Sequence, residues 1–242
     1  MSEAAPTKGE RSKAKLVAAT ADLLRRQGYH ATGLAEIVAE SGAPRGSLYF
    51  YFPGGKDELA CAALRAAGEQ WRHRIDVAIR GLRDAGAVID AIVELLASDL
   101  EASSFEHGCP VAAVALEATS PAVRAAIEEH YATWQATITE RIVQFGLPKA
   151  IAPQVATAAL AMVEGAMLLA KVSRSRAPLV IAGQALRTMV AAFVATVPAA
   201  SPIGAPASGS AAAAVVAATL PARPSAAAAV AAQKRRARRA RR

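Results

Sequence analysis

Apolar residues recur every three or four positions along most of this chain, which is the spacing of amphipathic helices. The first run is preceded by Thr7-Lys-Gly-Glu10, and this S/T-x-x-E spacing predicts a capping box at the start of a helix. That helix continues to about Gln27, with Gly28 past its end. No run alternates apolar and polar residues as half-buried strands do, so the pattern predicts an all-α protein.

The same period predicts six further helices in the second part of the chain. Because Val111 to Ala118 is apolar on nearly every side, we expect the helix there to be buried. The last two helices contain Gly165 and Gly183, which would let another helix pair approach closely. These two helices predict either a four-helix dimer interface or part of the core of a single chain. The six ranges are about 59–82, 87–103, 110–119, 121–145, 150–173 and 177–197.

Two short helices are predicted between residues 32 and 52. Thr32 is an N-cap type of residue for the first of them, and Gly42 stands where a C′ glycine would end it. Pro44 can begin the second, over Arg45 to about Tyr51, because its missing N–H is one of the donors left unpaired there. Two helices joined by a tight glycine-containing turn form a helix-turn-helix, which binds DNA. A helical hairpin that never meets DNA is the alternative.

The second short helix has one side that can pack in a core and another that can contact DNA. Leu48 and Phe52 share one face and can anchor the helix. Arg45 can bond guanine O6 and N7 or a phosphate, and Gly46 lets the backbone approach DNA closely. Hydroxyl groups suit phosphate oxygens or base edges, and the Phe50 ring can contact a thymine methyl group. The predicted DNA-binding residues are Thr32, Gly33, Pro44, Arg45, Gly46, Ser47, Tyr49, Phe50 and Lys56.

The run GAPRGSLYFYFPGGKDEL, residues 42–59, closely resembles the signature of TetR-family transcriptional regulators. The Gly, Leu-Tyr, Tyr-Phe and Lys-(acid)-Glu-Leu elements stand in the family's order. The Pro-Gly-Gly-Lys insertion and the later Gly-Cys-Pro-Val, residues 108–111, are similar to the LmrA-like branch. The resemblance is specific over about residues 10–60 and weaker to about 196. Two positions depart from the family: Phe50 stands where it often has His, and Pro44 where it often has a capping Ser.

This resemblance implies a fold of about nine helices, with a DNA-binding domain at residues 1–55 and a helical ligand-binding and dimerisation domain at 56–197. It also implies a homodimer on a palindromic operator, released by a small hydrophobic effector. The effector would shift helix four and with it the two recognition helices. The residues that we expect to line the effector pocket are Trp71, Phe105, His107, Cys109, Val114, Trp134, Ile138, Met162 and Met167. Each of them could instead be an ordinary core residue.

Charged residues are distributed unequally along the chain. Residues 199–242 carry eight Lys or Arg and no Asp or Glu, whereas the preceding residues carry 20 of each sign. The tail is rich in Pro, Ala, Ser and Gly, so we expect residues 198–242 to be disordered, with a basic end of undefined role. A second hypothesis is therefore a nonspecific architectural DNA-binding protein that acts through this basic arm.

Composition gives little support for an enzyme. The four His residues are scattered, and we find no HExxH, GxSxG or paired-Cys pattern, so we predict no enzyme and no cofactor or metal. His107 and Cys109 alone would make a poor metal site. The two Cys, the absence of a secretory signal and the Pro-interrupted run from 188 to 222 predict a cytoplasmic protein that does not associate with membranes. A helical enzyme that uses a C-terminal cavity is the remaining rival.

Overall fold

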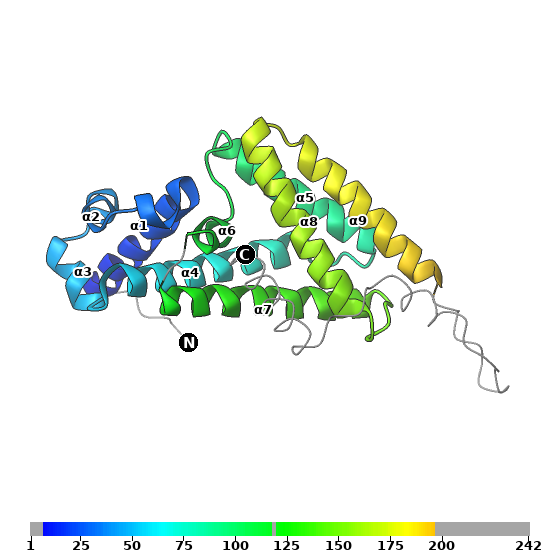
Figure 1. Cartoon of the computed structure of the whole chain (residues 1–242), viewed down its shortest axis with the longest axis horizontal. Helices are drawn as coiled ribbons and strands as arrows, with labels where there is room; N and C mark the ends of the chain where they lie inside the picture. The colour runs from blue at the N-terminus through cyan, green and yellow to red at the C-terminus, as the bar shows by residue number, and fades with distance from the viewer. Residues whose placement is uncertain (1–6, 118–119, 197–242) are drawn as a thin grey trace, which may run out of the picture. The chain divides into compact units, whose positions relative to one another are not determined.

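A computed structural model describes residues 7–117 and 120–196 of the chain. Within these ranges the chain forms α-helices and no strands, which confirms the all-α prediction (Figure 1). The prediction for residues 198–242 lies outside the described residues. The helices are α1 Lys8–Ala31, α2 Leu34–Ser41, α3 Arg45–Tyr51, α4 Gly55–Ala78, α5 Ala85–Ala102, α6 Pro110–Ala115, α7 Pro121–Gln144, α8 Ala152–Ser173 and α9 Ala177–Thr196.

Helix α1 begins and is interrupted where the sequence predicts. The Thr7 hydroxyl accepts a hydrogen bond from the Glu10 backbone N–H at 3.2 Å, and a Glu10 carboxylate oxygen accepts one from the Thr7 N–H at 2.7 Å. This is the expected capping box. At Gly28 the backbone has φ +79° and leaves the helical path before a last short turn ends at Ala31. A glycine adopts this conformation at little cost, so Gly28 redirects the chain.

Helices α2 and α3 follow the predicted turn chemistry except at one cap. Gly42 ends α2 in the left-handed conformation, and α3 spans Arg45 to Tyr51 as expected. The N-cap of α2, however, is Gly33 and not Thr32. Thr32 is buried, and its hydroxyl donates to the Gly28 carbonyl at 2.7 Å, so it closes the end of α1. The predicted capping role of Thr32 is therefore wrong.

A compact core holds α3 against α1, α2 and the start of α4. Leu48 and Phe52 are 1% and 2% exposed, and they pack with Leu16, Ile37 and Leu59. Burying a side chain of this size contributes roughly 1.5–3 kcal/mol. The predicted anchoring of α3 by Leu48 and Phe52 is thus confirmed.

A second core joins α1 to α4, α6 and α7. Leu24 and Tyr29 from α1 pack with Leu64 of α4, Val111 of α6 and Val123 of α7. The Tyr29 hydroxyl also hydrogen-bonds the Asp57 carboxylate at the start of α4. Helix α1 is therefore fixed to the helices that follow the helix-turn-helix, while the expected boundary between residues 55 and 56 stays a prediction.

Helix α6 is shorter and less buried than expected. It ends at Ala115, and its inner side chains Val111 and Val114 are fully buried. Leu116, in the turn that follows, is 87% exposed. The prediction of a helix buried on every side to Ala118 is therefore wrong in its last turn, because the helix ends before the apolar run does.

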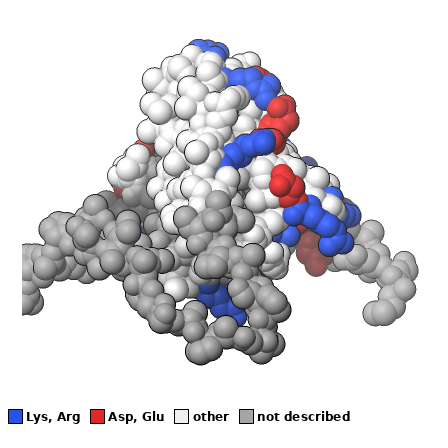
Figure 2. All heavy atoms as spheres, turned by 90° about the vertical axis from the view of Figure 1, so that its right-hand side faces the viewer, with Lys and Arg blue, Asp and Glu red and all other residues white. Residues whose placement is uncertain are grey.

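Helices α8 and α9 pack against each other, α8 also against α7 and α9 also against α5 (Figure 1). Among the described residues, α8 is the helix whose length and mean hydropathy of 1.7 would suit a membrane span. It packs against α7 and α9, and 28% of its apolar window is buried. Seen from the α9 side, much of the surface is uncharged, with charged residues gathered along one edge (Figure 2). The large exposed apolar residues of α8 and α9 are Leu168, Leu169, Val172, Val180 and Ile181.

Candidate nucleic-acid interface and ligand cavity

The outer face of α3 presents aromatic and polar side chains to solvent. Tyr49 is 55% exposed and Phe50 is 76% exposed, although Leu48 beside them is buried. The Phe50 ring contacts the Tyr51 ring edge-on, with centroids 4.8 Å apart. Arg45 at the start of the helix is also exposed. Exposing aromatic rings to water is unfavourable in free energy, so adjacent exposed rings are typical of a binding surface.

The backbone of α3 is open to a partner at its first turn. A Cβ atom added at Gly46 would meet no atom of the chain within 4 Å. The fold itself therefore does not require glycine at this position. Pro44 is exposed as the N-cap, and Ser47 is half-buried with its backbone N–H bonded to the Pro44 carbonyl at 2.8 Å. These residues and Arg45 lie together at the end of α3 that begins the predicted contact surface.

The remaining predicted DNA contacts differ in their accessibility. Gly33 is exposed at the start of α2. The Thr32 hydroxyl is buried and bonded to Gly28, so this conformation contradicts the phosphate contact predicted for its side chain. The Lys56 ammonium lies 4.3 Å from the centre of the Tyr29 ring and 3.5 Å from the His30 carbonyl oxygen, and burial lowers its pKa. A phosphate contact by Lys56 stays a prediction.

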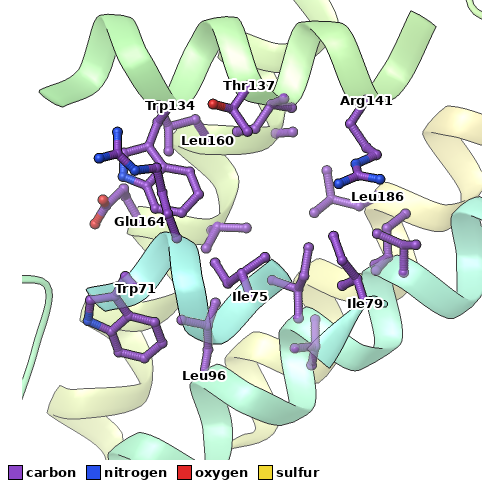
Figure 3. Close-up of a pocket in the computed structure, with 18 of the residues that line it drawn as sticks. Trp71, Ile75, Ile79, Leu96, Trp134, Thr137, Arg141, Leu160, Glu164 and Leu186 are labelled. Atoms are coloured by element: carbon purple, nitrogen blue, oxygen red, sulfur yellow. The ribbon is translucent and has the colours of Figure 1, made fainter. Parts of the chain in front are cut away.

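A cavity of about 360 Å³ lies among α4, α5, α7, α8 and α9 (Figure 3). Its walls are mostly aliphatic and aromatic, and both tryptophans of the chain, Trp71 and Trp134, line it. The volume and apolar walls are those of a site for a small organic ligand. Five of the nine predicted pocket residues line it: Trp71, Cys109, Trp134, Ile138 and Met167.

The other four predicted pocket residues do not line this cavity. Val114 is fully buried in the core between α1, α4 and α7. Phe105 and Met162 pack against the core of α5, α8 and α9. His107 faces α1, where its Nε2 lies 3.2 Å from an Asp22 carboxylate oxygen. Helical spacing identified apolar faces but not which neighbour each face would meet.

Polar residues at the cavity were missed by the sequence analysis. Glu164, His130, Thr137 and Arg141 line it. Glu164 lies near Trp134 and Arg141 at the opposite side in the close-up (Figure 3), and the His130 ring centre is 6.2 Å from that of Trp134. Burial lowers the pKa of His130 to about 4, and the nearby Arg72 adds to the effect. The imidazole is therefore neutral near pH 7. Glu164 had a detectable signal, because it is the one charged residue between positions 152 and 170.

A network of charged groups connects a cavity wall with α1. Trp71 lies beneath two guanidinium groups, with its ring centre 4.3 Å from Arg74 and 5.8 Å from Arg25. Both arginines pair with Asp99 of α5, Arg74 at 2.7 Å. Arg25 belongs to α1 and also donates to the Gly108 carbonyl at 3.2 Å. A ligand that moves Trp71 would therefore disturb contacts that position α1.

The described residues offer little for a metal or a catalytic centre. No three His, Cys, Asp or Glu residues are grouped there as metal ligands. The Cys109 thiol accepts a hydrogen bond from the Ala112 N–H as the N-cap of α6, and burial strongly raises its pKa. A thiol held protonated is a poor nucleophile and a poor ligand.

Comparison with known proteins matches both parts of the chain. Residues 16–63 match the family described as bacterial regulatory proteins, tetR family. Residues 85–185 match the C-terminal domain of LmrA/YxaF-like transcriptional regulators.

Individual proteins show the same likeness over most of the chain. The HTH-type transcriptional regulator LmrA of Bacillus subtilis is 35% identical over 170 residues, which is 69% of this chain and 90% of that protein. The uncharacterized regulator YxaF of the same species is 32% identical, over 74% of this chain and 95% of that protein. A crystal structure of regulatory protein TetR from Rhodobacter sphaeroides has a TM-score of 0.67 and 26% identity, covering 76% of this chain and 99% of that one.

Proposed function

The chain belongs to the TetR family of transcriptional regulators, and from this premise we propose that it is a ligand-responsive repressor. In the proposal a homodimer binds a palindromic operator in double-stranded DNA, in the cytoplasm. A small hydrophobic effector in the cavity then releases the protein from DNA. Residues 1–55 would supply the DNA contacts, and residues 56–197 the effector site and the dimer interface.

The observation that carries the proposal is the division of α3 into two faces. Leu48 and Phe52 hold the helix in the core, while Tyr49 and Phe50 are 55% and 76% exposed. A short helix fixed in this way can enter the major groove with its outer side chains against base edges. Arg45 and Gly46 at its exposed first turn suit a close approach to the groove. Thr32 drops out of the proposed side-chain contacts because its hydroxyl is buried.

The exposed apolar side chains of α8 and α9 support a dimer. Leu169 and Ile181, 60% and 65% exposed, belong to a larger group of apolar side chains on these two helices. Several large exposed apolar side chains on neighbouring helices are typical of protein–protein interfaces. A second copy using the same two helices would form a four-helix contact. Two recognition helices would then face successive major grooves, about 34–36 Å apart.

The proposed release mechanism couples the cavity to α1. An effector that contacts Trp71 would displace the guanidinium groups of Arg25 and Arg74, which share Asp99. Because Arg25 lies on α1, this would move the helix-turn-helix relative to the rest of the subunit. A coupling of about 1–3 kcal/mol between effector and DNA would give 5–150-fold release.

The test is selection of bound fragments from a random pool of DNA duplexes by the purified protein. We expect a palindromic sequence to be enriched. Arg45→Ala and Tyr49→Phe should weaken binding to the selected duplex, without changing the sedimentation of the dimer. Leu169→Glu should instead dissociate the dimer and weaken DNA binding through loss of the second half-site. Enrichment of no sequence, or unchanged affinity in both α3 variants, would refute the proposal.

A further inference from the structure

The cavity contains a carboxylate oxygen that the protein does not satisfy. Glu164 lies on α8 and lines the cavity, where its side chain is drawn beside Trp134 (Figure 3). Its Oε2 atom is buried and has no hydrogen-bonding partner among the described residues. Leaving a charged acceptor in this state costs more than the roughly 1–3 kcal/mol of an unsatisfied neutral group. A ligand that donates a hydrogen bond to Oε2 would remove this free-energy penalty.

The neighbours of Glu164 cannot neutralise its charge. The Cys109 thiol interacts with the carboxyl group, but S–H is a weak donor. The imidazole of His130 is neutral near pH 7, and Tyr131 keeps its proton because burial raises its pKa. Burial raises the pKa of Glu164, because no nearby cation offsets the loss of water around its carboxylate, so a bound ammonium group would stabilise the charged form. No lysine or arginine forms an ion pair with Glu164 among the described residues.

The far side of the cavity has a different character. Arg141 lines it there and lies 3.8 Å from the Asp76 carboxylate, so its charge is partly balanced by an acid of the protein itself. Between Glu164 and Arg141 the labelled wall residues are mainly apolar, among them Ile75, Ile79 and Leu160 (Figure 3). Arg72 of α4 also lines the cavity, and the Trp71 ring already contacts the guanidinium groups of Arg25 and Arg74. Glu164 is nevertheless the carboxyl group in the lining with an unpartnered buried oxygen, and the Trp134 ring beside it can favour a cation.

We propose that the cavity binds a compound made of an apolar ring system and one protonated amine, and that Glu164 is the residue that binds the amine. The ring system would fill the space between Trp71, Trp134 and the aliphatic wall. The ammonium group would donate to Oε2 of Glu164 and supply the missing partner. This inference rests on the proposed function only in treating the cavity as the effector site.

A matched set of three probes tests this ligand class. They are 1-naphthylmethylamine, 1-naphthylmethanol and 1-naphthoic acid, which carry an ammonium, a hydroxyl and a carboxylate group on the same ring at neutral pH. Binding to the full-length protein without DNA is measured by isothermal titration calorimetry. We expect the amine to bind most tightly, because it is the one probe with a positive charge to pair with the Glu164 carboxylate.

The decisive variant is Glu164→Gln, which keeps the shape of the side chain and removes its charge. The amine should bind this variant roughly tenfold to a hundredfold more weakly, as expected for the loss of a hydrogen bond to a charged group. The alcohol should bind both proteins within a few fold. Glu140→Gln, at an exposed position on α7, is the matched control and should leave all three affinities unchanged. Circular dichroism of each variant shows whether the helices are retained.

Three results would overturn the assignment. They are tighter binding of the acid than of the amine, no measurable amine binding by the wild-type protein, and equal amine affinity in the wild-type and Glu164→Gln proteins. The same samples are also tested on the selected DNA duplex. Retained sequence-specific DNA binding together with any of these results refutes the ligand class alone. Loss of sequence-specific binding in the wild-type protein refutes the proposed regulator instead.

Discussion

Phe50 and Phe52 lie two residues apart, and their replacement by alanine should have opposite consequences. Phe50 points outward from α3 and is 76% exposed, whereas Phe52 is 2% exposed in the core below it. Phe50→Ala is expected to reduce DNA affinity with little effect on folding. Phe52→Ala is expected to reduce stability. The two variants delete the same atoms, so each serves as the control for the other.

The magnitudes follow from the exposures. A Phe side chain offers about 150–250 Å² for burial, worth about 25 cal/mol per Å². Complete coverage of the exposed part of Phe50 would contribute roughly 3–5 kcal/mol, and a groove wall that covers half would contribute about 1.5–2.5 kcal/mol. Phe50→Ala should therefore weaken operator binding roughly tenfold to sixtyfold. Its contact with Tyr51 limits the loss of folding stability to at most about 1.5 kcal/mol.

For Phe52→Ala the loss should appear in the free energy of unfolding. Truncation of a fully buried Phe typically costs about 3–5 kcal/mol, part of which is the cavity left behind. Unfolding is followed by circular dichroism in guanidinium chloride, and DNA binding by fluorescence anisotropy of a labelled operator duplex at fixed salt. Unchanged operator affinity for Phe50→Ala, or a stability loss as large as that of Phe52→Ala, would refute the two-faced description of α3.

Two further predictions concern the fold around α1 and the cavity. Gly28→Ala should lower the free energy of unfolding by about 1–3 kcal/mol in thermal unfolding, since φ is +79° there and a Cβ would lie 2.5 Å from a Glu117 carboxylate oxygen. Gly46→Ala is the control, because a Cβ there would meet no atom within 4 Å, and it should not lower stability. Equal losses in the two variants would contradict this reason. His130 has a folded-state pKa of about 4 against an ordinary 6.5, so its contribution to stability should be present above pH 6.5 and be lost as the pH falls toward 4. His130→Asn should flatten that part of the dependence of the unfolding midpoint on pH, and an unaltered profile would show that burial of His130 is not the cause.

The sequence predicted the helices well where local signals define their ends. Thr7 and Glu10 make the capping box of α1, Gly42 ends α2, and Pro121 begins α7, each by a contact or conformation within a few residues. The same local reasoning misplaced the N-cap of α2. Thr32 is a suitable capping residue by type, but its hydroxyl bonds back to Gly28 because of how α1 ends. That choice depends on the path of the chain after Gly28.

The cavity was only partly predictable, because its lining depends on which helices pack against one another. Helical periodicity gives the inner face of each helix, and Trp71 and Trp134, which were predicted on that basis, both line one cavity. Val114 satisfies the same pattern but faces α1 and α4 instead. Glu164 was missed because apolar residues were favoured as pocket candidates, although it is the one charged residue between positions 152 and 170.

Both tryptophans of the chain line the same cavity. Ultraviolet emission excited at the red edge of protein absorption therefore originates from this one place in each subunit. Any compound that enters will alter the polarity or quenching around at least one of the two indoles, without a dye or an engineered label. The fluorescence of the unmodified protein can therefore report cavity occupancy and can be used to screen compound collections for molecules that bind there.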